Sequence, residues 1–271
     1  MATPRPFPLP LFSSAALLLC AAPAPCHAAA PVATILETKT ITPPEEPYCG
    51  WPTVAIRPNG ELWTVWSGGR DAHVCPLGQV RAMHSRDGGA TWTHPRVLLD
   101  TAIDDRDAGI VVTAKGTLLV TTFTSLAYEE VLSKQSAQKD SQNAPTGARF
   151  SAEKLARWTT ARDRLTEPER KAELGVWVLR STDQGSRWSA PVGTLVNSPH
   201  GPIQLKDGRL LYAGKELWTA EGRIGVAESK DDGLSWQWLA EIPSRSGDEV
   251  KKGYHELHAV ETEDGRILVQ I

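Results

Sequence analysis

The sequence predicts an all-β fold of the β-propeller class, and two repeated patterns predict it. A Ser-x-Asp-x-Gly-x-x-Trp pattern occurs three times, and four turn dipeptides each separate two apolar, β-rich runs. Units of three or four short antiparallel strands, repeated radially, make a propeller. The spacing from Ser181 to Ser229 gives a repeat of about 50 residues, which disfavours a solenoid or a sandwich.

The composition narrows the function classes. The chain has 271 residues and a formal net charge of −3. Acidic and basic residues are mixed along it, so it lacks the basic stripe that binding to nucleic acid requires. Ten tryptophans against four phenylalanines and four tyrosines are unusual. This excess indicates repeated packing positions, sugar-stacking platforms, or both.

Residues 1–30 are predicted to be a secretory signal peptide outside the fold. Arg5 gives a basic start, Leu11 to Ala22 an apolar stretch, and Ala28 to Ala30 the small residues of a cleavage site. The apolar stretch is shorter than the roughly 20 residues that a membrane span needs. A low-complexity Ala/Pro start is the alternative. We expect a secreted or periplasmic protein with no membrane span, whose folded part is residues 31–271.

The first repeated element is a hairpin. Asn59-Gly60, Lys115-Gly116, Asp207-Gly208 and Asp264-Gly265 each lie between two apolar runs. Such dipeptides favour tight hairpin turns because glycine and asparagine tolerate positive φ. The hairpins are therefore the starts of four strand units.

The second repeated element follows a strand-like run in three of these units. Its polar residues suit a local turn, because the aspartate can accept backbone hydrogen bonds and the glycine allows positive φ. The tryptophan can pack on a neighbouring sheet. We therefore predict structural and not catalytic roles for its twelve positions. They are Ser85, Asp87, Gly89 and Trp92; Ser181, Asp183, Gly185 and Trp188; and Ser229, Asp231, Gly233 and Trp236.

The second unit carries an insertion of about 40 residues between its hairpin and its repeated turn. Residues 125–173 are rich in Glu, Lys, Arg, Gln and Ala, and Ser151 precedes charged helix formers. Leu155, Trp158 and Leu165 could line one helical face. We predict a helical insertion that rises from this unit; a mobile, solvated loop is the alternative.

Cysteine and histidine placement gives no metal site. Cys49 and Cys75 remain after signal cleavage, and an exported protein could pair them or keep two separate thiols. His255 and His258 are three residues apart, which places them on opposite faces of a strand. No spacing typical of zinc ligands is present, so we expect no metal and no other cofactor.

The three turns resemble the Asp box of sialidases and related propellers. Two further segments narrow this resemblance. Ser198-Pro-His-Gly201-Pro-Ile-Gln-Leu205-Lys-Asp-Gly208-Arg-Leu-Leu is similar to the sialidase strand pair that reads roughly Gly-x-Gly-Ile-Gln-Leu-x-x-Gly-Arg-Leu. Glu256-Leu-His-Ala-Val-Glu261 resembles the sialidase segment Glu-Cys-Gln-Val-Val-Glu, and Trp66-Ser-Gly-Gly-Arg70 is similar to a Glu-Gly-Arg turn. The resemblance implies a six-bladed propeller of which this chain contains about three and a half blades, with the insertion in blade two.

The resemblance also implies a chemistry. A sialoside has a carboxylate on its anomeric carbon, which would repel a carboxylate nucleophile, so sialidases use a tyrosine. A glutamate beside the tyrosine accepts its proton, and Glu256 is the counterpart here. Three arginines bind the substrate carboxylate, and an aspartate acts as acid and base. The tyrosine and two of the arginines would follow Ile271, so we expect the chain to be inactive alone.

Two positions depart from that pattern. Cys49-Gly50-Trp51-Pro52 has no arginine where sialidases have the first of the three, and the nearest acid to the expected aspartate is Asp71. Arg106 is the best substitute for the missing arginine; Asp104 to Asp107 could instead be a solvated loop. The predicted catalytic residues are Glu256 and Asp71. The predicted substrate-binding residues are Arg70, His73, Asp105, Arg106, His200, Tyr254 and His255.

Three functions follow from these observations. The first is a sialidase-like glycoside hydrolase that releases sialic acid or a related acidic sugar. The second is a propeller that binds glycans without cleaving them, which the missing arginine favours. The third is an assembly-factor propeller that shares only the repeated turns, since a fold does not determine function. The expected partner is a glycan, and the sequence does not indicate an oligomeric state.

Overall fold

The computed structural model describes residues 32–139, 149–219 and 221–271. Two compact units are distinguished, Met1–Thr40 and Ile41–Ile271. Residues 32–40 form no helix or strand, and the second unit contains all the regular structure described below. The predicted signal peptide lies outside the described residues.

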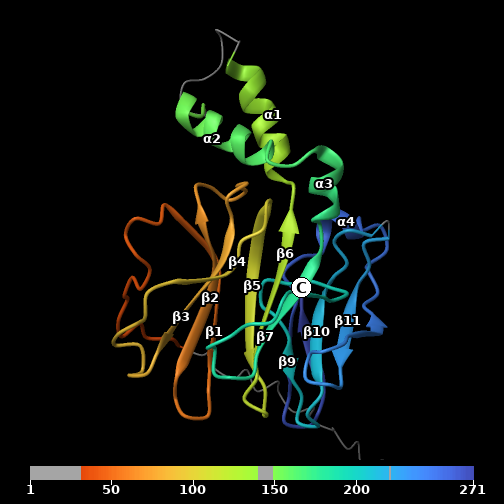
Figure 1. Cartoon of the computed structure of the whole chain (residues 1–271). Coiled ribbons are helices and arrows are strands. Elements are labelled where there is room, and N and C mark those ends of the chain that lie inside the picture. Colours follow the sequence, from red (N-terminus) through yellow and green to blue (C-terminus); the bar gives the residue numbers. More distant parts are fainter. Residues whose placement is uncertain (1–31, 140–148, 220) are drawn as a thin grey trace, which may run out of the picture. The chain divides into compact units, whose positions relative to one another are not determined.

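Four antiparallel sheets make up the second unit (Figure 1). The first consists of β1 (Tyr48–Ile56), β2 (Leu62–Arg70), β3 (Gln79–Ser85) and β4 (Arg96–Leu99). The second consists of β5 (Asp104–Val112), β6 (Leu118–Ser125), β7 (Val176–Ser181) and β8 (Val192–Gly193). The third consists of β9 (Ile203–Gln204), β10 (Leu210–Lys215), β11 (Ile224–Ser229) and β12 (Gln237–Glu241), and the fourth pairs β13 (His258–Glu261) with β14 (Ile267–Gln270). This confirms the all-β class.

The four predicted hairpins are confirmed. Gly60, Gly116, Gly208 and Gly265 all have φ between 79° and 91°, and each closes the turn between the first and second strands of its sheet. The second strands of the first three sheets are buried almost throughout. Their apolar and β-branched residues suit this position.

The three repeated turns have the same internal geometry. In each, the glycine N–H donates to the serine Oγ at 2.8 Å, and the serine hydroxyl donates to the aspartate. The aspartate also accepts a backbone N–H from four residues later at 2.9 Å. These hydrogen bonds stabilise the charged carboxylate and hold the pKa of Asp87 and Asp231 at about 2. The predicted local role of the aspartates is therefore observed.

Two of these turns also contact the preceding sheet. Gly185 lies so close to the indole of Trp63 that a Cβ atom there would come within 2.2 Å of the ring. Arg96 donates to the carbonyl of Gly185 at 2.6 Å. In the third repeated turn, Asp232 accepts hydrogen bonds from Thr117, directly before β6, at 2.6 Å and from Arg180 in β7 at 2.9 Å.

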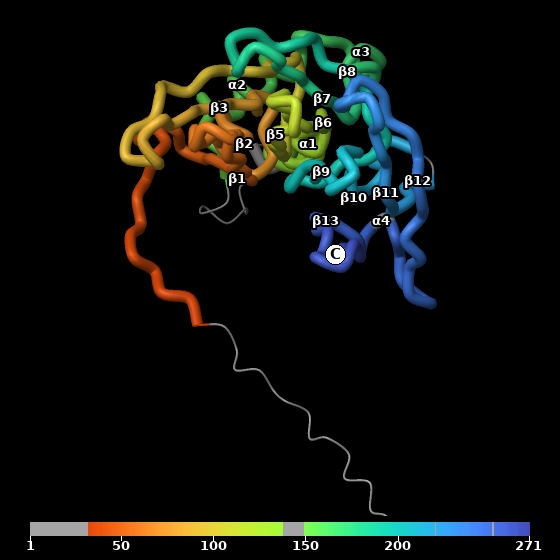
Figure 2. The backbone as a smooth tube through the Cα atoms, turned by 90° about the horizontal axis from the view of Figure 1, so that it is seen from below, coloured from red at the N-terminus to blue at the C-terminus, as the bar shows by residue number. Residues whose placement is uncertain are grey.

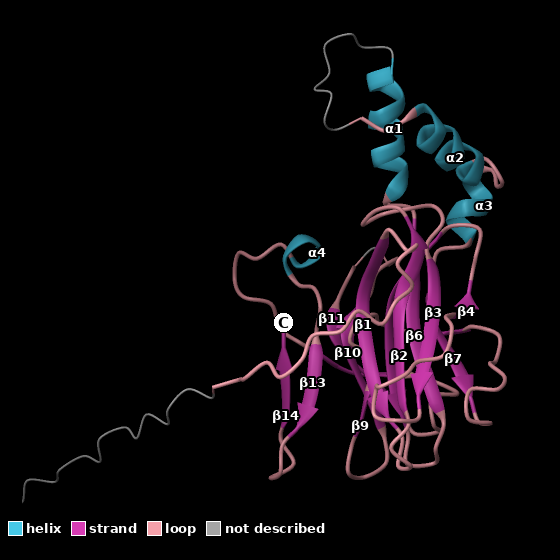
Figure 3. Cartoon of the chain, turned by 90° about the vertical axis from the view of Figure 1, so that its left-hand side faces the viewer, coloured by secondary structure: helices cyan, strands magenta, loops and turns pink. Residues whose placement is uncertain are grey.

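The helical insertion is confirmed where it is described. It contains α1 (Tyr128–Lys139), α2 (Ala152–Arg162) and α3 (Glu167–Ala172), which stand at one end of the sheets (Figure 3). Ser151 caps α2, as the sequence predicts, by accepting the N–H of Lys154. Trp158 is fully buried in a core with Tyr128 and Cys75, whereas residues 140–148 lie outside the described residues.

Three smaller findings complete the fold. Cys49 is exposed and Cys75 is buried, and both thiols are free, so the two do not pair. A single helical turn, α4 (Val250–Gly253), precedes the fourth sheet and was not predicted. None of the helices in the described part of the chain has the length and apolarity that crossing a bilayer requires.

The inner strands of the four sheets, β1, β5, β9 and β13, come together along one side of the unit (Figure 2). Thr53 in β1 donates to the carbonyls of Ala108 and Pro199, which joins the first three sheets. Ser198 donates to the carbonyl of Leu257, which joins the third sheet to the fourth. The beginnings of the inner strands are thereby held next to one another.

Candidate functional site

A cleft of about 330 Å³ opens where the inner strands begin. The strand register places the repeated turns at the other end, because Leu62 of β2 pairs with Ser85 of the first turn, while Arg70 pairs with Tyr48 at the start of β1. The predicted separation of the turns from the site is therefore observed in the first sheet. The cleft is lined by Trp51, His73, Arg106, Asp107, Phe123, Asn197, Pro199, Lys215, Leu217, His255 and Glu256.

One position of the repeat supplies a cleft residue in every sheet. Trp51, Asp107, Pro199 and Glu256 each lie nine residues before the hairpin glycine of their sheet, and all four line the cleft. The three that are not proline have left-handed backbones, with φ of 50°, 51° and 57°. Such φ values are costly for residues with a side chain and concentrate at functional sites. The shared offset is the sequence signal that could have identified Trp51 and Asp107.

Arg106 lies between two aromatic rings. Its guanidinium carbon is 4.7 Å from the centre of the Trp51 ring and 5.7 Å from that of Phe123. Only 8% of the residue is exposed, and its Nε atom is buried without a hydrogen-bond partner among the described residues. A guanidinium that lines a cleft and is largely shielded from solvent is suited to bind a carboxylate.

His73 connects Arg106 to a phenol. Its Nε2 is 3.4 Å from Nη2 of Arg106, and its Nδ1 is 3.3 Å from the hydroxyl of Tyr48. Burial and the two nearby arginines, Arg106 and Arg70, lower the pKa of His73, so the ring is neutral near pH 7. Because a guanidinium can only donate, Nε2 accepts and Nδ1 carries the proton, which it donates to Tyr48.

Two carboxylates form the acidic part of the cleft. Burial raises the pKa of Asp107 to about 6; the nearby Arg106 and Arg70 lower it, and Glu256 raises it further. One oxygen of Asp107 has no hydrogen-bond partner among the described residues and lies 3.9 Å from Nε of Arg106. A carboxyl group with a pKa near 6 can give or take a proton around neutral pH.

Two of the predicted ligand residues lie beneath the cleft. Arg70 is fully buried; it pairs with Asp104, and its guanidinium carbon is 5.4 Å from the centre of the Trp51 ring. Asp105 is also fully buried and accepts hydrogen bonds from the amide and hydroxyl of Thr101. Both side chains support the strands that carry the cleft residues and do not line the cleft.

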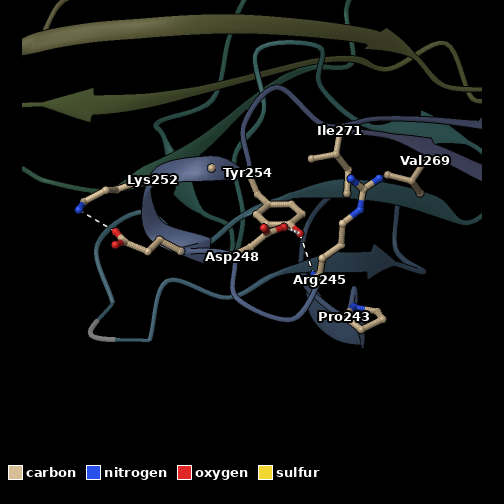
Figure 4. A pocket seen from close by; sticks show the side chains of 9 residues that line it. Pro243, Arg245, Asp248, Lys252, Tyr254, Val269 and Ile271 are labelled. Carbon is tan, nitrogen blue, oxygen red and sulfur yellow. Dashed lines mark hydrogen bonds and ion pairs between the residues drawn. The ribbon is translucent and has the colours of Figure 1, made fainter.

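Three other predicted residues lie elsewhere. Asp71 binds the insertion, with Oδ2 accepting from Trp158 Nε1 at 2.8 Å and from Arg157 Nη2 at 2.5 Å. The hydroxyl of Tyr254 donates to Asp248 and accepts from the backbone N–H of Arg245, in a separate pocket formed by residues 243–254 and β14 (Figure 4). His200 lines a further cavity next to the cleft. The structure thus brings together His73, Arg106, His255 and Glu256 from the predicted set.

Among the described residues, no cluster of three or more His, Cys, Asp or Glu side chains could hold an ion.

Comparisons with known proteins give a fold and no closer relationship. No family model matches the sequence, and no curated protein matches it. Among solved structures, a protein of unknown function from Dyadobacter fermentans is 19% identical with a TM-score of 0.56, over 82% of this chain and 61% of that one. The Hadza microbial sialidase Hz136 is 18% identical with a TM-score of 0.57, over 82% of this chain and 41% of that one.

The NanB sialidase from Streptococcus pneumoniae is 14% identical with a TM-score of 0.52, over 85% of this chain and 49% of that one. The chain therefore spans between 41% and 61% of the length of these three structures. At these identities the likeness concerns the fold alone, and that fold is sialidase-like.

Proposed function

We propose that the cleft binds an acidic sugar at the end of a glycan, as part of a sialidase-like glycoside hydrolase. The observation that carries this proposal is Arg106, which lines the cleft and whose guanidinium lies between Trp51 and Phe123. A sugar carboxylate would accept a charge-assisted hydrogen bond from this guanidinium. The low exposure of Arg106 would strengthen the interaction, because solvent screens a buried charge less.

The other cleft residues would act on the bound sugar. Asp107, with its pKa near 6, would serve as the acid and base in place of the aspartate that sialidases use. Glu256 would accept the proton of a phenol nucleophile, as its resemblance to the sialidase glutamate implies. The exposed parts of Trp51 and Phe123 would pack on the apolar face of the sugar ring.

The complete assembly of sheets is also a proposal. We propose that the four sheets belong to a six-bladed propeller in which inner strands surround the cleft. The recurrence of one strand unit and the sialidase-like fold support this arrangement.

A second function has a specific observation in its favour. The stretch Cys49-Gly50-Trp51-Pro52 has no arginine where sialidases have one, and the carboxylate of Asp71 is engaged by Arg157 and Trp158. A cleft without these two catalytic groups would suit a protein that binds acidic glycans without cleaving them.

Titration calorimetry of the purified chain with N-acetylneuraminic acid tests the binding step. We expect Arg106→Ala to weaken binding at least about tenfold, which corresponds to about 1.4 kcal/mol. Arg245→Ala is the matched control, because Arg245 is an exposed arginine in the neighbouring pocket, and it should leave binding unchanged. Equal binding by wild type and Arg106→Ala would contradict the proposal.

Release of the fluorophore from a methylumbelliferyl sialoside separates the two functions when it is measured on a protein extended past Ile271, because the phenol nucleophile of the proposed hydrolase would lie there. Turnover that is strongly reduced by Glu256→Gln supports the hydrolase. Binding that depends on Arg106, with no turnover, supports the glycan-binding alternative.

A further inference from the structure

His73 lies beside Arg106 in the wall of the cleft. Its Nε2 is 3.4 Å from Nη2 of Arg106, and both side chains line the cleft. The loop around His73 is held in place, because Val74 and Cys75 pack against the helical insertion while His73 itself is exposed. Two nitrogens this close together can be reached by the two oxygens of one carboxylate.

The protonation state of His73 decides how Arg106 is used. In the neutral ring, Nδ1 carries the proton and Nε2 accepts from Arg106. A neutral His73 therefore competes with a ligand carboxylate for an N–H of this guanidinium. A proton on Nε2 would turn the ring into a second donor and would release that N–H of Arg106 to the ligand.

The groups that face His73 explain why a bound anion would favour its charged form. Burial and the guanidiniums of Arg106 in β5 and Arg70 in β2 lower the pKa of His73, and Glu256, just before β13, raises it. Tyr48 at the start of β1 contacts Nδ1 and can accept from it in either state. A carboxylate bound at Arg106 would offset the repulsion between the two arginines and a protonated ring.

The ring of Trp51 lies close to all three basic side chains. Its centre is 5.0 Å from that of the His73 ring, 4.7 Å from the guanidinium carbon of Arg106 and 5.4 Å from that of Arg70. The π electrons of an indole attract a cation within about 6 Å. The indole would therefore reduce the cost of placing a charged imidazole beside two guanidiniums.

We propose that His73 takes up a proton from solvent when the acidic sugar binds, and that its imidazolium and Arg106 together bind the sugar carboxylate. The proton adds to Nε2, which donates to one carboxylate oxygen, while Nη2 of Arg106 donates to the other. A neutral sugar brings no charge that would draw this proton, so His73 favours acidic over neutral sugars. This inference rests on the proposed function, because it takes the cleft to bind an acidic sugar.

Proton uptake makes the affinity depend on pH with a definite sign. Binding raises the pKa of His73, so the added affinity is fully present below the pKa of the free protein and is lost as the pH rises through the pKa of the complex. The free pKa lies below the ordinary value of 6.5. We therefore expect affinity to fall between about pH 5 and about pH 8, by at most about tenfold per pH unit from this group. Asp107, with its pKa of about 6, acts in the same direction, because its protonation removes a negative charge from the cleft.

Nuclear magnetic resonance of the histidine rings separates His73 from Asp107. The chain has seven histidines, and the resonance of His73 is the one that disappears in His73→Gln. We expect its pKa to rise by at least about one unit when the protein is saturated with N-acetylneuraminic acid, in wild type and in Asp107→Asn alike. His94 is the internal control, because it is exposed and lies outside the cleft, so its pKa should not change on binding.

Calorimetry of His73→Gln gives the matching affinities. The glutamine amide can accept from Arg106 but cannot gain a proton, so the variant should bind the sugar within about threefold of wild type at about pH 8 and at least about tenfold more weakly at about pH 5.5. The exposure of His73 favours folding of the variant, and thermal unfolding checks this. Binding that depends on Arg106 with an unchanged pKa of His73 would overturn the inference and leave the proposed function standing. Absence of binding at both pH values would instead refute the proposed function.

Discussion

Replacing Asp71 by alanine is expected to loosen the helical insertion. The carboxylate is 16% exposed and accepts from Trp158 Nε1 at 2.8 Å and from Arg157 Nη2 at 2.5 Å. A hydrogen bond to a charged group contributes about 1.5–3 kcal/mol, and the loss would leave a buried indole N–H without a partner. Arg157 is 49% exposed, so its ion pair adds only about 0–1 kcal/mol.

The expected loss in the free energy of unfolding is therefore about 2–3 kcal/mol. For a domain of this size, each kcal/mol lowers the Tm by about 2–4 °C, which predicts a decrease of about 4–12 °C. Differential scanning calorimetry measures it, and hydrogen exchange should become faster in residues 150–173. Asp71→Asn keeps an oxygen that can accept from Trp158, so its effect should be smaller.

Asp163→Ala is the control, because Asp163 pairs with Arg162 at the surface and is 54% exposed. Its removal should change stability by less than about 1 kcal/mol. An unchanged Tm for Asp71→Ala together with a loss of sugar binding or turnover would refute the anchoring role. Asp71 would then be the catalytic acid that the sequence predicts.

Two further predictions concern buried groups. Burial raises the pKa of Asp105 to about 8, so the folded state keeps a proton that the unfolded chain releases near pH 4. The free energy of unfolding should therefore fall as the pH rises from about 4 to about 8, by at most about 1.4 kcal/mol per pH unit from this group. Asp105→Asn should reduce this pH dependence when the free energy of unfolding is measured by urea titration. The same pH dependence in wild type and variant would contradict the assignment. Gly185→Ala should destabilise the protein by about 2–4 kcal/mol, because φ is 81° and the added carbon would clash with Trp63. Gly60 has a similar φ of 84° but lies in open space, so Gly60→Ala should cost only about 1 kcal/mol. Similar Tm values for the two variants would exclude the clash.

The sequence was sufficient for features that depend on neighbours in the chain. Hairpins such as that at Gly60 and turns such as Ser85 to Trp92 are stabilised by groups within a few residues, so a short pattern predicts them. The cap at Ser151 is equally local.

The site was predicted less well because its residues depend on distant partners. Asp71 has acid chemistry and a suitable position in the sequence, but Arg157 and Trp158 bind it from 86 and 87 residues away. Asp105 is drawn into the interior, while Asp107 two residues later takes a left-handed backbone and reaches the cleft. Which acid of this run faces a ligand is decided by packing between sheets, and no local pattern contains that information.

In the repeated turns, the residues that close the turn differ from the residue that contacts the adjacent sheet, and this separation is useful for engineering. Serine, aspartate and glycine close the turn. The variable residue before the glycine can instead bind the adjacent sheet, as Asp232 does by accepting hydrogen bonds from Thr117 and Arg180. A sheet could therefore be grafted as a unit into a related protein if that one residue and its hydrogen-bond partners were exchanged together. For the same reason, a duplicated strand unit could gain new contacts with its neighbouring sheet through a few substitutions, while the residues that close its turn stay unchanged.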